Sequence, residues 1–278
     1  MASTPHSRCL AQGSRWRICD SVCRASPSDL PFEEQHAVFS VSAVLAGTFI
    51  YRSARGRAVL SAGSLLIGQQ SSEFSCSHEY SCGDRCISFT FDESWVEDFV
   101  RELPGVRSAR ISHVRVPPVQ SLVGLIADVQ ALADGFDIQG SEELAMRMAA
   151  TAMTFSQAGP KLPDATRADE RRIAAVLRNL EEEAAYPLSL DRLAGTAGMS
   201  TYHFLRVFQR VTGQTPWRFI LSRRLALAAR HLAEGRGTVL EAAVASGFTD
   251  LSEFTRQFRR HIGVTPGVYC RDRRRPSN

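Results

Sequence analysis

The amino-acid sequence predicts an α+β protein of two domains: an antiparallel β barrel with flanking helices, followed by an all-α domain. Two observations predict this class. Short runs of alternating apolar and polar residues, separated by Gly and Ser, fill residues 38–91. One short helical pattern then occurs twice between residues 190 and 266. At 278 residues the chain is long enough for two domains that each bury a core.

The predicted barrel covers about residues 30–92. Apolar and polar residues alternate from Val38 to Leu45, and Gly47 is expected to end this strand. Short strands of similar spacing favour an antiparallel barrel or sandwich; they are expected over residues 48–52, 57–60, 65–68, 74–80 and 86–91. Residues 1–30 have weak periodicity, so an irregular start is expected.

Helices are expected to flank the barrel over about residues 93–157. The patterns change to helical spacing over 94–101, 119–133 and 142–156. The middle segment carries an apolar stripe that is a candidate dimer seam, with packing against its own barrel as the equal alternative. That stripe consists of Leu122, Ile126, Val129 and Leu132.

The domain boundary is predicted in a stretch rich in Pro, Ala and charge. Residues 161–168 are the expected linker, between a first domain over 1–160 and a second over 169–278. An amphipathic helix over 169–185 is expected to open the second domain.

The second domain contains an internal repeat with an offset of about fifty residues. Each copy is typical of a helix, a Gly-containing turn and a second helix, which is the layout of a helix-turn-helix. The units are expected over about 188–213 and 239–263, joined by a connector helix over about 216–234. The matching residues of the first copy are Phe204, Arg206, Phe208, Arg210, Gly213, Thr215 and Pro216, and those of the second are Phe254, Arg256, Phe258, Arg260, Gly263, Thr265 and Pro266.

Within each copy the phenylalanines are four residues apart, so both are expected to face the core and to leave the opposite face for DNA. Arg can donate two hydrogen bonds to guanine, Glu can accept from cytosine, and hydroxyls suit phosphates. The candidate DNA-binding residues are Ser200, Thr201, Tyr202, His203, Leu205, Arg206, Asp250, Leu251, Ser252, Glu253 and Arg256.

The charge distribution agrees with a polyanion as partner. Residues 161–278 hold 20 Lys and Arg against 12 Asp and Glu, a net charge of +8, whereas residues 1–160 have a net charge of −4.

No apolar run is long enough to span a bilayer and the first residues do not resemble a secretory signal, so a cytoplasmic protein without a membrane partner is expected. The odd count of seven Cys predicts no structural disulfides.

Residues 188–270 resemble the DNA-binding domain of the AraC/XylS family of transcriptional regulators, whose signature matches AxxxGFTDLSEFTRQFRRHIGVTPGVY in the second unit. The resemblance implies a regulator, an activator by family habit, that binds double-stranded DNA and contacts RNA polymerase. It implies that Tyr202, Leu205 and Arg206 read bases from the first unit. Leu251, Ser252, Glu253 and Arg256 do so from the second. Leu205 departs from the pattern because it offers no hydrogen bond.

Residues 33–91 more loosely resemble the cupin-like sensor barrel of the same family, which implies a small-molecule effector and a homodimer. No catalytic residue, metal or cofactor is assigned. The low-ranked metal candidates are His36, Cys76, His78, Cys82 and Cys86, since Cys and His together suit zinc or iron. Redox sensing by the thiols is a further alternative. The competing function is a cupin-type metal-dependent enzyme fused to a DNA-targeting domain; the missing His-x-His pair weighs against it.

Overall fold

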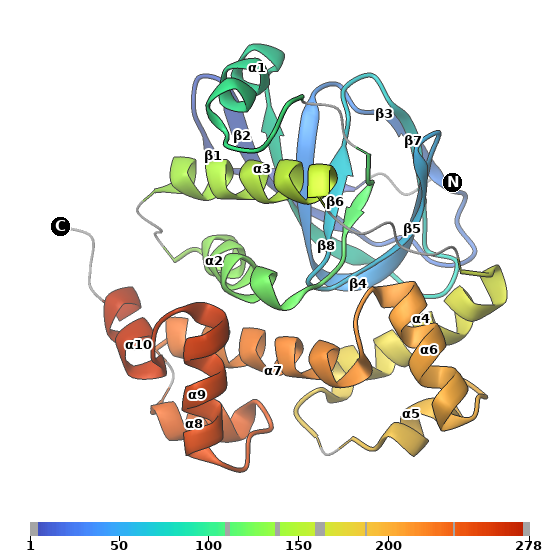
Figure 1. Ribbon diagram of the computed structural model, residues 1–278, viewed down its shortest axis with the longest axis vertical. Coiled ribbons are helices and arrows are strands. Elements are labelled where there is room, and N and C mark those ends of the chain that lie inside the picture. Colours follow the sequence, from blue (N-terminus) through green and yellow to red (C-terminus); the bar gives the residue numbers. More distant parts are fainter. Residues whose placement is uncertain are drawn as a thin grey trace.

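The computed structural model describes residues 5–108, 112–136, 140–158, 165–186, 188–235 and 237–274. Eight strands come first, a short ninth strand follows the first helix, and helices form the remainder (Figure 1). The strands are β1 (His6–Gln12), β2 (Trp16–Cys23), β3 (Phe32–Gln35), β4 (Phe39–Ser53), β5 (Gly56–Ser61), β6 (Leu65–Gly68), β7 (Glu73–Ser77), β8 (Asp84–Phe91) and β9 (Arg115–Val116). The helices are α1 (Glu93–Glu102), α2 (Val123–Ala133, after the 3-10 turn Gln120–Leu122), α3 (Ser141–Ala158), α4 (Arg167–Glu183), α5 (Leu190–Thr196), α6 (Thr201–Thr212), α7 (Pro216–Ala233), α8 (Val239–Ala245), α9 (Leu251–Ile262) and α10 (Pro266–Arg274).

The strands form one antiparallel sheet that curls around the long strand β4. The order is β1-β2-β8-β4-β6-β9; β5 and β7 pair with the second half of β4, and β3 pairs with β7. The predicted antiparallel sheet is therefore confirmed. The pairing does not close into a barrel in the described chain, because β1 pairs only with β2 and the two-residue β9 only with β6. We call this element the curled sheet.

Two expectations about the strands are wrong. Gly47 does not end a strand, because β4 runs through it with a φ of +83° and a register shift between Val44 and Ala46. Such a bulge bends a strand without terminating it. Residues 6–23, expected to be irregular, form β1 and β2. β1 is an almost wholly exposed edge, so its sequence lacks the apolar alternation by which strands are recognised.

The α2 helix lies between the curled sheet and α7 (Figure 1). Its sheet-facing side joins the core that contains Val41 and Phe89, and its opposite side packs with Leu225 and Ala228 of α7. Of the two alternatives for the apolar stripe, packing against the chain's own sheet is the one observed, and the dimer seam is not. Leu122, Ile126 and Val129 are buried in the core of the sheet, and Leu132 packs at its edge.

The helical half begins two residues before the predicted helix. Thr166 caps α4 by accepting a hydrogen bond from the Asp169 amide at 3.1 Å. The first half of the expected linker, residues 161–164, lies outside the described residues. No helix in the described ranges has the length and apolar character needed to cross a membrane.

The two halves share a core. Ile50 of β4 and Val59 of β5 pack with Ile173 and Leu177 of α4 and with Val211 of α6. Figure 1 shows α4 and α6 against the outer side of the curled sheet, with α7 leading from them toward α8, α9 and α10. The sheet and the helices are thus in direct contact.

Candidate nucleic-acid interface and internal pocket

The first helix pair, α5 and α6, is bounded by residues whose side chains or backbone favour helix ends. Ser189 and Ser200 cap the two helices, accepting hydrogen bonds from the Arg192 and His203 amides at 3.2 and 3.4 Å. Gly198, in the turn between the helices, has a φ of +61°, a conformation that favours glycine. The local sequence therefore sets both the turn and the start of α6.

The second helix pair, α8 and α9, is bounded in the same way with different side chains. Thr238 and Glu241 form a capping box at the start of α8. Asp250 accepts hydrogen bonds from the amides of Ser252 and Glu253 at 2.7 and 3.0 Å, which begins α9. In the intervening turn Gly247 has a φ of +83°, and a side chain there would collide with the Ala185 carbonyl.

The inner faces of α6 and α9 share one arrangement of two phenylalanines. In each helix two phenylalanines are fully buried, with ring centroids 5.5 Å apart and ring planes about 60° apart. These pairs are Phe204 with Phe208 and Phe254 with Phe258. Edge contacts of this kind stabilise the packing beyond the area they bury. The sequence-based placement of these residues in the core is confirmed.

The outer face of α6 exposes most of the predicted residues. Tyr202, His203 and Arg206 are exposed, with Tyr202 at 73% of its surface. Leu205 and Thr201 are half-buried, and the Thr201 hydroxyl donates to Asp191 at 2.7 Å. The exposed surface of α6 therefore combines one aromatic, one imidazole and one guanidinium group.

The outer face of α9 presents a different set. Leu251, Ser252 and Arg256 are exposed. Glu253 is half-buried, forms an ion pair with Arg256, and accepts a hydrogen bond from the Gln257 amide at 2.7 Å. Asp250 is also exposed, but its carboxylate is engaged as the helix cap.

Further exposed side chains that were not predicted adjoin these two faces. Arg259 and Arg260 border a groove beside α9, together with Arg256. Trp217 and Arg218 are exposed in the first turn of α7. Two features of the sequence could have pointed to these side chains: the basic run in α9, and the aromatic residue directly after the N-terminal proline of α7. Both helix pairs are flanked by groups that suit phosphate or base contacts.

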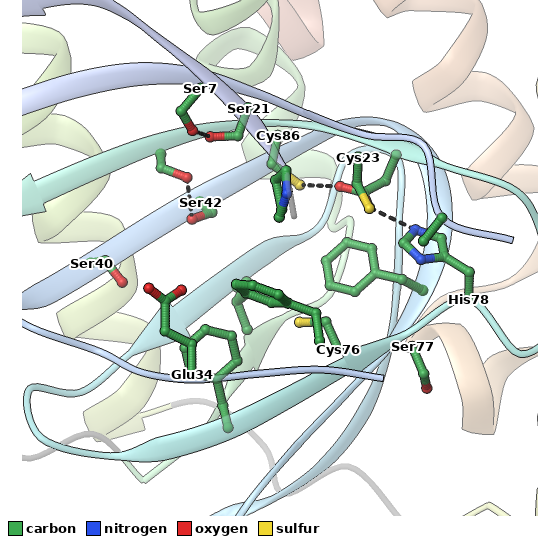
Figure 2. A pocket seen from close by; sticks show the side chains of 18 of the residues that line it. Ser7, Ser21, Cys23, Glu34, Ser40, Ser42, Cys76, Ser77, His78 and Cys86 are labelled. Carbon is green, nitrogen blue, oxygen red and sulfur yellow. Dashed lines mark hydrogen bonds and ion pairs between the residues drawn. The ribbon is translucent and has the colours of Figure 1, made fainter. Parts of the chain in front are cut away.

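The curled sheet encloses a pocket of about 390 Å³ (Figure 2). His36 lines it, donates to or accepts from the Tyr51 hydroxyl at 3.0 Å, and stacks on Phe74 with centroids 4.1 Å apart. Burial lowers the pKa of His36 to about 4, because the imidazolium form loses its hydration. The pocket is large enough for a small molecule or an ion.

The metal candidates occupy different places. His36, Cys76, His78 and Cys86 line the pocket, whereas Cys82 is exposed and does not. His78 lies together with Cys23 and Asp84, two residues that the sequence did not point to, and one ligand atom of each lies within 4.8 Å of the others. All seven cysteines are free thiols.

The family model and the similar sequences match the helical half of the chain. A family model described as a helix-turn-helix domain matches residues 193–272. The Tn10 TetD protein of Escherichia coli is 38% identical over 101 residues, which cover 36% of this chain and 73% of TetD. The transcriptional regulator Rob of Salmonella typhimurium is 35% identical over 102 residues, and the chain spans only 35% of its length. Among solved structures, the DNA-binding domain of AdpA in complex with a target DNA is 29% identical, with 37% of this chain and 93% of that domain covered and a TM-score of 0.36.

Proposed function

The chain belongs to the AraC family of helix-turn-helix transcriptional regulators, and from that premise we propose that its two helix pairs read two consecutive major-groove segments of one DNA duplex. In this proposal α5–α6 and α8–α9 are the two helix-turn-helix units, with α6 and α9 as recognition helices. Residues 165–274 form the DNA-binding domain, and residues 5–158 form a sensor domain that regulates it.

The repeated inner face carries this proposal. Two helices with the same buried phenylalanine geometry lie at opposite ends of α7 (Figure 1). Eighteen residues of α7 span about 27 Å at 1.5 Å per residue. Consecutive major-groove faces on one side of a duplex are about 34 Å apart, so a rigid helix of this length suits two adjacent grooves.

The two outer faces differ, and this difference supports an asymmetric site. We assign base contacts to Tyr202, Leu205 and Arg206 on α6. On α9 we assign them to Leu251, Ser252, Glu253 and Arg256. Ser200, Thr201, His203 and Asp250 lie at the helix starts, where side chains and amides meet the DNA backbone. Because the two recognition helices differ, the chain is expected to bind an asymmetric DNA site in one orientation.

We further propose that the pocket of the curled sheet receives the effector, and that the bound regulator activates by contacting RNA polymerase. The curled sheet shares a core with α4 and α6, so a change at the effector pocket can be transmitted to the recognition helix α6 through direct packing contacts. One chain holds both readers, so reading a site requires no dimer. The alternative of a metal-dependent enzyme fused to a DNA-targeting domain is disfavoured, because the similar protein Rob is a transcriptional regulator.

Selection of DNA from a random duplex pool by the full chain tests the proposal. The expected result is enrichment of one asymmetric sequence, whose affinity falls steeply with salt because phosphate contacts release counterions. A Tyr202→Ala/Arg256→Ala variant should lose the enrichment. Arg178→Ala, which removes an exposed charge from α4, is the matched control and should retain it. A folded chain that enriches no sequence would overturn the proposal.

A further inference from the structure

Three chemically distinct donors converge at one end of the internal pocket. His78 Nε2 lies 2.7 Å from Asp84 Oδ1, and Cys23 Sγ completes a group whose ligand atoms all lie within 4.8 Å of one another. The Cys86 thiol donates to the other carboxylate oxygen of Asp84 at 3.2 Å. Figure 2 shows Cys23, Cys86 and His78 at this end of the pocket and Glu34 and Ser40 at the other.

These donors are positioned by strand register. Cys23 in β2 and Asp84 in β8 are direct cross-strand partners, which brings their side chains close together. Cys86 follows Asp84 by two residues and shares its face of β8. His78 follows directly after β7. Paired strands thus hold three of the four groups, which limits the adjustment a ligand would require.

The pocket has the charge character of a cation site. Cys23, His78 and Cys86 are each at most 8% exposed. No Lys or Arg is among the described residues that line the pocket, whereas three carboxylates are: Asp29, Glu34 and Asp84. An anionic effector would meet no compensating charge there, so the lining favours a positively charged ligand.

The types of ligand atom indicate which cations the site would prefer. Thiolate and imidazole ligands select borderline-soft divalent ions such as Zn²⁺, and a carboxylate is the third common zinc ligand. Zinc–ligand bonds of about 2.0–2.3 Å in a tetrahedron separate the ligand atoms by about 3.3–3.8 Å. For Cys23, His78 and Asp84, the observed limit of 4.8 Å lies within a small side-chain adjustment of that geometry.

We propose that Cys23, His78 and Asp84, with Cys86 as the fourth donor, form a binding site for one borderline-soft divalent cation of the Zn²⁺ type. Coordination replaces the His78–Asp84 and Cys86–Asp84 hydrogen bonds, and each coordinating thiol releases its proton to solvent. A bound cation supplies the positive charge that a buried thiolate needs.

The segment that carries the site also contacts the helical half. Between His78 and Asp84, the Tyr80 hydroxyl donates to the Arg167 carbonyl of α4 at 3.4 Å. Asp84 pairs with Gly47, whose amide donates to the Glu181 carboxylate of α4 at 3.3 Å. Coupling of the cation to DNA affinity follows from these contacts and rests on the proposed function; the site itself does not.

Titration of the reduced full chain with Co²⁺ and Zn²⁺, without DNA, tests the site. We expect one equivalent of Co²⁺ to give thiolate-to-cobalt charge-transfer absorption, which Zn²⁺ then removes by displacement. Cys23→Ser and His78→Gln should each weaken Zn²⁺ binding at least about 10–100-fold in a chelator competition. Cys82→Ser is the matched control, because this exposed thiol lies on the same segment outside the pocket, and it should bind as the unmodified chain does.

Absence of the charge-transfer band in a folded chain would overturn the site, as would equal affinity in the two variants and the unmodified chain. Circular dichroism of each variant without metal establishes that it is folded. DNA affinity is then measured with and without Zn²⁺. A chain that binds Zn²⁺ but no DNA retains the site and refutes the proposed function, whereas one that binds DNA but not Zn²⁺ does the reverse.

Discussion

The guanidinium group of Arg115, in the sheet half of the chain, donates a hydrogen bond at 2.8 Å to the main-chain carbonyl of Val211 in the last turn of α6. The same Nη1 atom donates to the Val59 carbonyl of β5 at 2.6 Å. One buried side chain therefore joins the curled sheet to the helix that we assign as the first DNA reader. Burial lowers the pKa of Arg115 to about 10, which still leaves it charged at neutral pH.

Arg115→Met should weaken the contact between the sheet half and the helical half of the chain. It leaves two buried carbonyls without their donor, and we expect a loss of about 1–3 kcal/mol in the free energy of unfolding. Urea denaturation measures this loss. Arg101→Met, on an exposed face of α1, is the control and should change stability by less than about 0.5 kcal/mol. Equal stability of the two variants would show that Arg115 does not join the halves.

The two turn glycines should respond differently to the same substitution. Both have positive φ, so either Gly→Ala change strains the backbone by about 1–2 kcal/mol. Only at Gly247 does the added methyl group also collide with the Ala185 carbonyl; at Gly198 it meets open space. Gly247→Ala should therefore cost about 3–5 kcal/mol and Gly198→Ala only the strain. Similar urea midpoints for the two variants would contradict this packing.

Arg206 should contribute to sequence preference. Because it is exposed on α6, Arg206→Ala should leave folding intact and cost about 1–3 kcal/mol of binding free energy at the selected site. The loss should be confined to one base position when every position of the site is varied in equilibrium binding. Uniform weakening on all sequences would instead identify Arg206 as a phosphate contact.

His36 should make the stability of the chain depend on pH. Its pKa is about 4 in the folded state and 6.5 as the ordinary value, so between these pH values the unfolded chain binds more protons. The contribution of neutral His36 to the free energy of unfolding is fully present above about pH 6.5 and is lost as the pH falls toward 4. His36→Phe can still stack on Phe74. In this variant the free energy of unfolding should vary with pH by about 2–3 kcal/mol less across this window. The exposed His203→Phe is the control, and an unchanged slope in His36→Phe would refute the assignment.

How much could be predicted from sequence differs between the halves for a physical reason. Helix caps and phenylalanines four residues apart are local signals, so the connector expected over 216–234 is observed as Pro216–Ala233. The sheet depends on pairing between distant residues. The exposed edge strand β1 carries no apolar pattern, and the glycine Gly47, just after the bulge between Val44 and Ala46, resembles a strand end in the sequence. Cys23 and Asp84 meet only because β2 and β8 pair, so their group could not be found from spacing along the chain.

In the proposed mode of binding, one chain contacts two adjacent major grooves through α6 and α9. Hydroxyl-radical footprinting of the full chain on its selected duplex tests it most directly. We expect two protected patches on one side of the duplex, about 10–10.5 base pairs apart, with Arg206→Ala weakening one patch and Arg256→Ala the other. A single patch, or two patches that weaken together in either variant, would contradict it.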